Sequence, residues 1–313
     1  MNIRECIARD ISIPEALIDE AISVARAHVK IFHIKKKSGG SRKIFHPSKK
    51  LKTIQYWLIH SVFKRMTIHD AAMAYRNDIS ILHNAQLHRS NRFFLKMDLE
   101  NFFPSISFYD LKPLLNHWHK SANPDWDLDP EAEDLIRNVC FYENDRLAIG
   151  YPSSPIISNI AMREFDSKAV ALITNHRFGK VIYTRYADDL VFSTDIKGVC
   201  SEIKHQIENL IANTNSPDIK VNNVKTKIGS STGGSASVTG LKICPNGHIT
   251  IHRNQKDHIR LLLSLYKKGV LNEDDQRSLL GNLSYCHYVA PDFYTKISKK
   301  YFKEIHELRV KDL

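Results

Sequence analysis

The segment over residues 181–194 constrains the fold most strongly, because two runs of strand-forming residues flank a short acidic turn. It reads VIYTRYADDLVFST, and the β-branched and aromatic residues on both sides predict a strand, a tight turn and a second strand. Asp188 and Asp189 would lie at the tip of this hairpin, where their side chains can leave the sheet. Aspartate is also common in turns for local backbone reasons. The pair alone therefore does not establish a catalytic site.

A third carboxylate follows another predicted strand. In the segment FFLKMDLENFFP, Asp98 ends an apolar run and precedes Pro104, a residue that interrupts helices. Magnesium prefers hard oxygen ligands and is often held by one or two carboxylates. Carboxylates on two neighbouring strands fit two-metal phosphoryl transfer, in which the ions lie roughly 3.5 to 4 Å apart. Since adjacent residues on a strand point to opposite faces, Asp98 and Asp188 are the better candidates to bridge the ions.

The N-terminal part is expected to contain helices and one basic hairpin. Apolar residues at helical spacing predict a helix over residues 14–29, with Ser12 as its cap, and a buried helix over residues 51–66. Between them, two apolar-rich runs flank SGGS at 38–41, the composition of a hairpin turn. Nine of the residues in 30–52 are Lys or Arg and none is acidic. A solvated edge hairpin and a basic finger over phosphates both fit this pattern.

The rest of the chain combines strands and helices and then becomes helical. The polar run over residues 229–237 is expected to be a loop, and residues 201–214 a helix. From residue 255 the pattern is helical, with one helix ended by Gly269 and a basic aromatic helix over residues 293–308. Strands interspersed with helices predict an α+β core followed by a separate C-terminal helical part.

The net charge indicates which partners the chain can bind, and the cysteine content indicates the cellular compartment. The chain has 45 Lys and Arg against 34 Asp and Glu, a net charge of +11 that suits nucleic acid better than an acidic membrane surface. Its five cysteines form no C-x-x-C pair, which favours a reducing cytoplasm over a disulfide framework or a zinc ribbon. No apolar stretch approaches about 18 residues and no signal-peptide pattern opens the chain, so secretion and a membrane partner are not expected.

Three segments together resemble the palm motifs of reverse transcriptases. FLKMDLENFFPSI, YPSSPIISNIAM and YTRYADDLVFS follow one another in the family's order, and the last matches its Y-x-D-D box. VNNVKTKI at 221–228 is similar to the family motif N-x-x-K-T, and KKSGGSRKI at 36–44 is similar to the fingers pattern K-x-x-G-x-x-R-x-I. The resemblance extends from about residue 35 to residue 251.

Two further elements resemble marks of bacterial retron reverse transcriptases, N-A-x-x-H and V-T-G, and both are expected to recognise RNA. Their residues here are Asn84, Ala85, His88, Val238, Thr239 and Gly240. The resemblance implies an α+β right-hand polymerase with an antiparallel palm sheet and a helical thumb. Its expected parts are an N-terminal helix and fingers over 1–90, a palm with inserted fingers helices over 91–252, and a helical thumb over 253–313.

The resemblance also implies an activity and partners. Such an enzyme is an RNA-directed DNA polymerase that copies a structured non-coding RNA into single-stranded DNA, using deoxynucleoside triphosphates. Its first primer hydroxyl would be a ribose 2′-OH, so that RNA and cDNA stay joined in a branched product (msDNA). An effector or toxin protein is a further expected partner, as part of antiphage defence.

The metal site follows from the same motifs. Asp98, Asp188 and Asp189 would be the catalytic carboxylates and would bind two Mg²⁺ ions, for which Mn²⁺ can substitute. The backbone carbonyl of Leu99 would be a further metal ligand.

The family motifs also assign residues to the incoming nucleotide, namely Lys36, Arg42, Phe103, Gly150 and Lys225. Lys36 and Arg42 would hold the triphosphate as a point charge and a bidentate fork. Phe103 would exclude a 2′-hydroxyl, with core packing as the alternative, and Lys225 would protonate the leaving pyrophosphate, with a solvated charge as the alternative. Around Gly150 the chain reads LAIGYPSSP where the family commonly has LPQGAPSSP, so Ile149 replaces a glutamine.

Two other functions stay open at this point. One is a different reverse transcriptase of the same fold, such as a group II intron-like enzyme, which N-A-x-x-H and V-T-G disfavour. The other is an RNA-binding scaffold without catalysis, which the intact Asp98, Asp188 and Asp189 disfavour.

Overall fold

The computed structural model describes residues 1–35 and 39–310, and it confirms an α+β architecture with antiparallel sheets. Its central sheet has the strand order β4-β5-β3-β6, and every neighbouring pair is antiparallel. The strands are β3 (Phe93–Asp98), β4 (Val181–Tyr186), β5 (Asp189–Thr194) and β6 (Lys227–Ser230). The predicted strand, turn and strand over residues 181–194 is therefore confirmed.

The two faces of this sheet have different coverings, because side chains alternate along each strand. Helices α9 (Arg163–Ile173) and α10 (Val199–Ala212) pack on one face and bury Leu95, Met97 and Phe192. The other face carries Asp98 at one end of β3 and is covered at the opposite end by α4 (Ile81–His88). One end of this second face is thus left for polar side chains.

The N-terminal helices correct one prediction. Ser12 is not the cap of the second helix; it ends α1 (Ile3–Ile11), where its φ of 55° is left-handed. Asn2 and Glu5 form a capping box that starts α1, and α2 (Glu15–Ser23) begins after Pro14. The prediction failed because a short helix with a strong N-terminal cap was missed.

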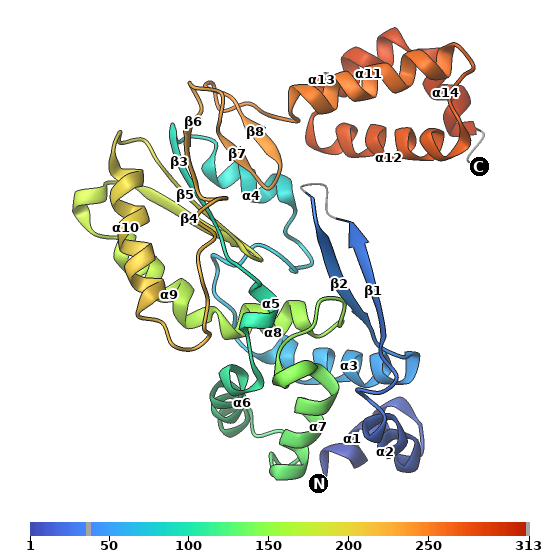
Figure 1. Ribbon diagram of the computed structural model, residues 1–313, viewed down its shortest axis with the longest axis vertical. Helices are drawn as coiled ribbons and strands as arrows, with labels where there is room; N and C mark the ends of the chain where they lie inside the picture. The colour runs from blue at the N-terminus through green and yellow to red at the C-terminus, as the bar shows by residue number, and fades with distance from the viewer. Residues whose placement is uncertain (36–38, 311–313) are drawn as a thin grey trace.

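The basic segment folds as expected into a hairpin of β1 (Lys30–Lys35) and β2 (Ser41–His46). Gly39 and Gly40 have φ values of 90° and 78°, the positive values that glycine adopts readily. Figure 1 shows this hairpin standing apart from the central sheet, between the N-terminal and the C-terminal helices. Helix α3 (Lys49–Ser61) supports its base and is buried, as predicted.

Further helices connect the hairpin and the sheet. They are α5 (Phe102–Ser105), α6 (Phe108–Ala122), α7 (Pro130–Cys140) and α8 (Ser154–Ala161). Pro104 lies inside the short helix α5, so it does not prevent a helix there.

The C-terminal part has a hydrophobic core of its own, which continues into α4 and a three-stranded sheet. The strands are β7 (Ser237–Val238), β8 (Leu241–Ile243) and β9 (Ile249–Thr250), and the helices are α11 (Arg253–Lys267), α12 (Glu273–Val289), α13 (Pro291–Lys300) and α14 (Phe302–Val310). The single helix predicted over 293–308 is interrupted at Tyr301, whose ring is buried in this core. The expected part boundaries at residues 90 and 252 stay a prediction.

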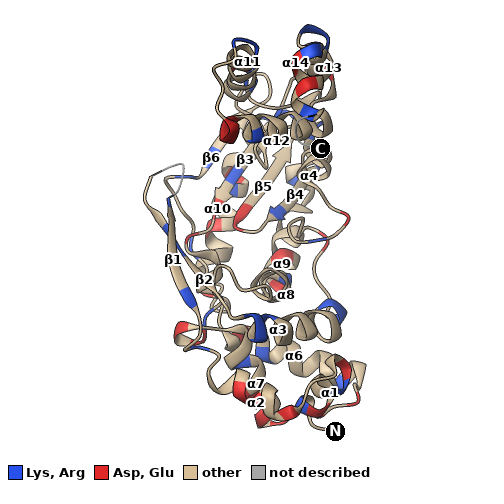
Figure 2. Cartoon of the chain, turned by 90° about the vertical axis from the view of Figure 1, so that its right-hand side faces the viewer, with Lys and Arg blue, Asp and Glu red and all other residues tan. Residues whose placement is uncertain are grey.

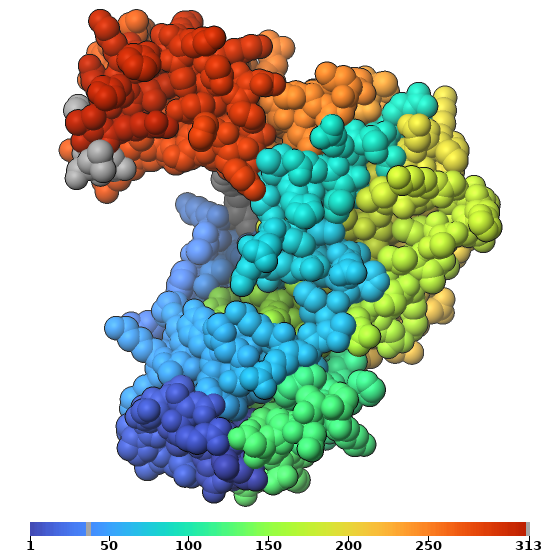
Figure 3. All heavy atoms as spheres, turned by 180° about the vertical axis from the view of Figure 1, so that it is seen from behind, coloured from blue at the N-terminus to red at the C-terminus, as the bar shows by residue number. Residues whose placement is uncertain are grey.

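The C-terminal helices overhang the rest of the molecule. Figure 3 shows a hollow in the surface between them and the N-terminal part. Within residues 1–35 and 39–310, no helix is both long and apolar enough to cross a membrane.

Candidate active site

The acidic turn between β4 and β5 consists of two residues, Ala187 and Asp188. Ala187 has a φ of 56°, a left-handed conformation that costs a residue with a side chain roughly 1 to 2 kcal/mol. It is also buried, so the surrounding structure holds it in place. Strain of this kind often occurs at functional sites, where it fixes a geometry that a relaxed turn would lose.

Strand register brings the carboxylates to one end of the sheet. Asp98 is paired with Asp189 across β3 and β5, so both side chains leave the same face. Asp188 lies in the turn, and its backbone carbonyl accepts a hydrogen bond of 2.9 Å from the amide of Leu99. Lys96, on the same face as Asp98, lies 3.0 Å from the Asp189 carboxylate. The sequence argument favoured Asp98 with Asp188; the register makes Asp189 the direct neighbour of Asp98.

The charges at this end of the sheet are unevenly balanced. Burial, together with the negative charges of Asp189 and Asp98, raises the pKa of Asp188. Lys225 donates to both carboxylate oxygens of Asp98, at 2.9 and 3.1 Å, and this hydrogen bond raises the pKa of Lys225. Asp98 and Asp189 thus each have a lysine within ion-pair distance, whereas at Asp188 the attraction of Lys225 is outweighed by burial and by the charge of Asp189.

The carboxylates fit a divalent cation in their chemistry. Buried carboxylates that repel one another gain most from a cation with a double charge, and hard oxygen donors suit Mg²⁺. In the part of the chain that the structure describes, no three acidic, histidine or cysteine side chains already surround one point as metal ligands. Lys225 contacts both oxygens of Asp98, so a cation bound there would be repelled by this ammonium. The predicted role of the Leu99 carbonyl stays a prediction; Leu99 itself is buried beside the turn.

A cleft of about 810 Å³ opens beside these carboxylates. Asp98 and Asp189 line it together with three lysines, Lys96, Lys225 and Lys227. A polyanion entering this cleft would meet lysines on both sides of the acidic residues. The lysines of β3 and β6 were not singled out by the sequence, because their convergence depends on strand pairing.

Phe103 is partly buried in α5, with its ring centroid 5.5 Å from that of Phe102 and 6.3 Å from that of Tyr75. Tyr75 was missed by sequence reasoning, yet it is half-exposed and has a φ of 64°. Burial and the nearby Asp188 raise the pKa of Tyr75 to about 12. Nothing in the hydrophobic pattern indicates this residue, because its left-handed backbone arises from contacts distant in the sequence.

The remaining nucleotide assignments lie on the hairpin and the loop that touches it. Arg42 is exposed on β2, and Lys36 lies outside the described residues. Gly150 has a φ of 109°, and a Cβ there would lie 2.4 Å from the Phe45 carbonyl oxygen. The amide of Phe45 donates 2.8 Å to the carbonyl of Ile149. Gly150 therefore permits the loop to dock on the hairpin, and its contact with a nucleotide stays a prediction.

The two retron-type elements contact each other. The hydroxyl of Thr239 donates 3.0 Å to the carbonyl of Ile81, at the start of α4. His88, at the end of α4, is hydrogen-bonded to Ser193 and Thr184 of the central sheet, at 2.7 and 2.8 Å. The buried members of the two elements are Asn84, Ala85, His88 and Val238. These side chains join α4, the sheet and the V-T-G turn, and any effect on RNA recognition acts through the surface that they support.

Comparison with known proteins decides the family. A family model described as "Reverse transcriptase (RNA-dependent DNA polymerase)" matches residues 34–268. The chain is 42% identical over 278 residues to the retron Ec73 reverse transcriptase of Escherichia coli, covering 88% of each chain. The chain belongs to the retron reverse transcriptases. It is also 32% identical to the retron Ec83 reverse transcriptase of Escherichia coli, covering 88% of this chain and 87% of the relative.

A solved structure confirms the right-hand polymerase fold. The apo telomerase of Candida tropicalis matches with a TM-score of 0.51 and 14% sequence identity, covering 91% of this chain and 62% of the telomerase. At that identity the likeness concerns the fold alone. The family model and the retron relatives make this chain an RNA-directed DNA polymerase, a class of enzyme that uses divalent metal ions.

Proposed function

We propose that this retron reverse transcriptase copies a structured non-coding RNA into single-stranded DNA and adds the first nucleotide to a ribose 2′-OH. We further propose that two Mg²⁺ ions, or Mn²⁺ in their place, bind at Asp98, Asp188 and Asp189. The observation that carries the metal assignment is the grouping of these carboxylates at one end of the sheet, beside a lysine-lined cleft. The fingers, palm and thumb are assigned to residues 1–90, 91–252 and 253–313.

The reaction joins the primer hydroxyl oxygen to the α-phosphorus of a deoxynucleotide and breaks the bond from that phosphorus to the departing pyrophosphate. Bound divalent ions supply an activated hydroxyl and neutralise the developing negative charge. Asp98, Asp188 and Asp189 would hold these ions, and Lys96 would orient the carboxylate of Asp189. Lys225, which contacts Asp98, would donate a proton to the leaving pyrophosphate.

Selection of the nucleotide would fall to groups on α5, on the basic hairpin and on the loop at Gly150. Phe103 closes the space beside the sugar at C2′ and so favours deoxynucleotides. Arg42, with Lys36, binds the triphosphate, since a guanidinium matches phosphate oxygens in a bidentate fork. Gly150 lets the loop that follows Ile149 approach the hairpin closely enough to complete this pocket.

An RNA partner is supported by cations outside the catalytic cleft. Figure 2 shows Lys and Arg positions along β1 and on the C-terminal helices. Burial lowers the pKa of Lys256 in α11. The positive charges of Arg260, of Lys242 in β8 and of Lys296 in α13 lower it further. Lys256 and Arg260 both lie over the ring of Phe293. Cations that gather in this way at the junction of sheet and helices fit a phosphate backbone.

The test of the priming proposal uses the enzyme expressed with the RNA encoded beside it. Total nucleic acid bound to the purified enzyme is treated with ribonuclease and analysed for DNA that keeps one 2′-linked ribonucleotide. A branched species from the wild-type enzyme, absent with Asp188→Asn, supports the proposal. DNA with a free 5′ end and no attached ribonucleotide contradicts it.

We also propose that the RNA–DNA product and the enzyme act with an effector or toxin protein in antiphage defence. This proposal extends the retron assignment. Expression with the neighbouring genes should co-purify one such protein in a complex that depends on the RNA. An enzyme that protects cells from phage without a bound protein would contradict it.

A further inference from the structure

Arg185 of β4 is fully buried one residue before the Y-x-D-D box. Its guanidinium makes three hydrogen bonds to Asp166 of α9, between 2.7 and 3.1 Å, and Asp166 is also fully buried. The hydroxyl of Tyr183 donates 2.7 Å to the same carboxylate. Replacing such a pair by apolar residues is often neutral or stabilising, so stability alone is a weak reason for it.

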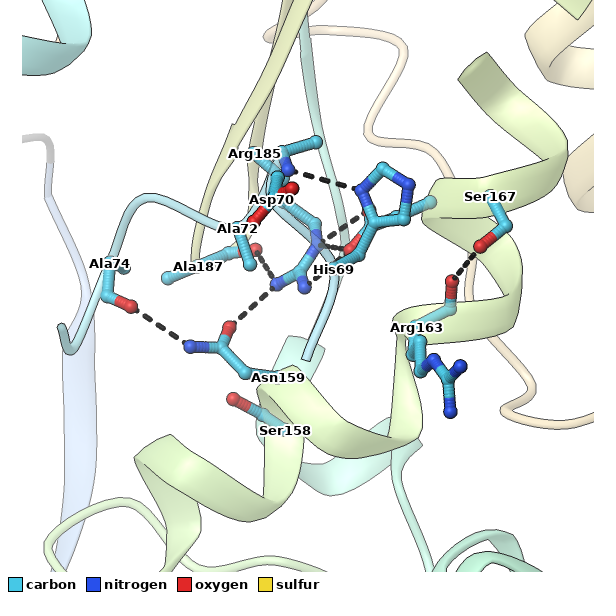
Figure 4. Close-up of polar contacts among 12 residues, drawn as sticks. His69, Asp70, Ala72, Ala74, Ser158, Asn159, Arg163, Ser167, Arg185 and Ala187 are labelled. Atoms are coloured by element: carbon cyan, nitrogen blue, oxygen red, sulfur yellow. Dashed lines mark hydrogen bonds and ion pairs between the residues drawn. The ribbon is translucent and has the colours of Figure 1, made fainter. Parts of the chain in front are cut away.

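The same guanidinium reaches two other elements. It donates 3.1 Å to the side-chain oxygen of Asn159 in α8 and 3.4 Å to the carbonyl of Ala187 in the acidic turn. Asn159 in turn donates 2.9 Å to the carbonyl of Ala74. Figure 4 shows Asn159 between Ala74 and the guanidinium of Arg185, and the carbonyl of Ala187 beside the same guanidinium nitrogen that contacts Asn159. One side chain therefore links α9, α8 and the strained turn.

The backbone of Arg185 adds a connection to the segment before α4. Its amide donates 2.7 Å to the carbonyl of Ala71, and its carbonyl accepts 2.8 Å from the amide of Met73. This segment continues to Tyr75, the left-handed residue beside Phe103. The guanidinium also lies 6.0 Å from the ring centroid of Phe102, next to Phe103.

We propose that Arg185 is a positioning residue that fixes the turn bearing Asp188 and, through Phe102 and the segment ending at Tyr75, the ring of Phe103. It couples the metal-binding end of the sheet to the sugar pocket. The inference rests on the proposed roles of Asp188 and Phe103. Only a guanidinium has enough donors in one plane to bind Asp166, Asn159 and Ala187 together, so lysine is not an equivalent replacement.

Three variants test this inference. Arg185→Lys keeps the charge but loses the fork. Asn159→Ala keeps the ion pair with Asp166 but removes the links to Ala74 and Arg185. A triple variant, Arg185→Met with Asp166→Leu and Tyr183→Phe, removes the charges and the hydroxyl together and leaves no buried group unpaired at these positions. The matched control, Glu164→Gln, breaks the exposed pair of Glu164 with Lys168 on the same helix as Asp166.

Each variant is examined by thermal unfolding, by Mn²⁺ titration with electron paramagnetic resonance, and by primer extension with deoxy- and ribonucleotides. A displacement of about 1 Å at a reacting group can cost about 100-fold in rate, so kcat of Arg185→Lys should fall by about that factor. Mn²⁺ affinity and the preference for deoxynucleotides should fall as well, while KM for the primer–template stays unchanged. In Asn159→Ala, kcat, Mn²⁺ affinity and the preference for deoxynucleotides should fall by smaller factors. In Glu164→Gln, all three should equal those of wild type.

Only variants that unfold cooperatively, and are therefore folded, are used to judge the inference. Variants that keep kcat, Mn²⁺ affinity and sugar preference within about twofold of wild type would falsify the inference, even if their unfolding temperature drops. Failure of the proposed function gives a different result. If Asp188→Asn itself retains activity, the metal assignment is wrong, whereas an inactive Asp188→Asn beside unaffected Arg185 variants rejects the positioning role alone.

Discussion

The ammonium group of Lys225 lies 2.9 Å from a carboxylate oxygen of Asp98, although 127 residues separate the two in the chain. Lys225 is 56% exposed, whereas Asp98 is almost buried. A cation that binds Asp98 is attracted to the same oxygens and is repelled by this ammonium. The metal ion and the lysine assigned to the leaving pyrophosphate therefore compete for the carboxylate of Asp98 before substrate arrives.

Replacing Lys225 by methionine should separate these two roles. Because an exposed ion pair contributes at most about 1 kcal/mol, the Mn²⁺ concentration at half-saturation should fall by about two- to fivefold. The maximal rate of extension should fall at the same time, since the proton donor is lost. Electron paramagnetic resonance gives the first quantity and single-turnover extension the second. Lys227→Met removes a charge from the same cleft without touching Asp98, and an equal gain in Mn²⁺ affinity there would reject the competition.

Asp188→Asn should abolish polymerisation and leave the fold intact. Removing groups that only support metal ligands costs roughly 10- to 100-fold, so removing a ligand should cost more than about 100-fold. The substitution also relieves repulsion from Asp98 and Asp189, so the unfolding temperature should not fall. Primer extension with Mg²⁺ and with Mn²⁺ measures the loss. Asp195→Asn, at an exposed residue that follows the far end of β5 and pairs with Arg92, serves as the control and should keep wild-type activity.

Much of the catalytic end of the sheet could be predicted, because its signals are local. The runs beside the acidic turn identified β4 and β5, and the apolar run before Asp98 identified β3. Their pairing set Asp98 opposite Asp189, a register that no single segment contains. The hairpin turn at Gly39 could be predicted for the same local reason, because a tight hairpin turn needs residues with positive φ and the sequence supplies glycine there.

What could not be predicted depends on contacts between distant segments. The pair of Arg185 and Asp166 joins a strand to a helix, and neither residue belongs to a periodic pattern that indicates burial of charge. Tyr75 follows a segment whose Ala71 and Met73 are hydrogen-bonded to the backbone of Arg185, more than 100 residues away in the chain. The burial of His88 was likewise hidden, because a histidine in a short motif is equally compatible with an exposed binding role.

Phe103→Ala should admit ribonucleotides. A steric contact in a pocket is worth roughly 10- to 200-fold in discrimination, so the ratio of deoxy- to ribonucleotide incorporation should fall by a factor in that range. Competition between the two nucleotides on one primer–template measures it. Tyr109→Ala, an exposed aromatic residue on α6, controls for general loss of ring packing. A ratio equal to that of wild type would show that Phe103 is ordinary packing beside Tyr75.

His88 should make the free energy of unfolding depend on pH. Burial lowers its pKa from 6.5 to about 3, so between these values the unfolded chain binds a proton that the folded chain does not. Stability attributable to neutral His88 is therefore full above the unfolded pKa. It falls by about 1.4 kcal/mol per pH unit as pH decreases toward the folded pKa.

His88→Gln should remove this part of the pH dependence, even though losing the bonds to Ser193 and Thr184 lowers stability at every pH. Guanidinium unfolding at about pH 7.5 and about pH 5 measures the difference in slope. His83 is exposed on the same helix, and His83→Gln should keep the wild-type slope. An unchanged slope for His88→Gln would mean that His88 is already protonated in the folded chain.

Choice of the RNA should reside in the C-terminal part together with the surface over α4. Side chains supply affinity through phosphates, and specific RNA readers usually contact exposed bases in loops. The lysines of α13 and of the start of α14 are exposed, namely Lys296, Lys299, Lys300 and Lys303. Among the aromatic residues here, Tyr301 is buried and the hydroxyl of Tyr294 accepts a bond from Arg309, whereas Phe302 is exposed. These lysines are therefore the main contacts expected here, with Phe302 as the ring able to stack on a base.

The test exchanges residues 254–313 for the matching segment of a related retron enzyme. Initiation on the RNAs of both enzymes is compared with extension of a generic RNA template carrying a DNA primer. The exchanged enzyme should start on the RNA of the segment's donor and extend the generic template at the wild-type rate, because Asp98, Asp188 and Asp189 are untouched. A quadruple variant with Lys296, Lys299, Lys300 and Lys303 changed to glutamine should weaken RNA binding and reduce its salt dependence. If RNA choice stays with the original body while generic extension is normal, the C-terminal helices do not select the template, and selection must lie in the surface that α4 and the turn at Thr239 present.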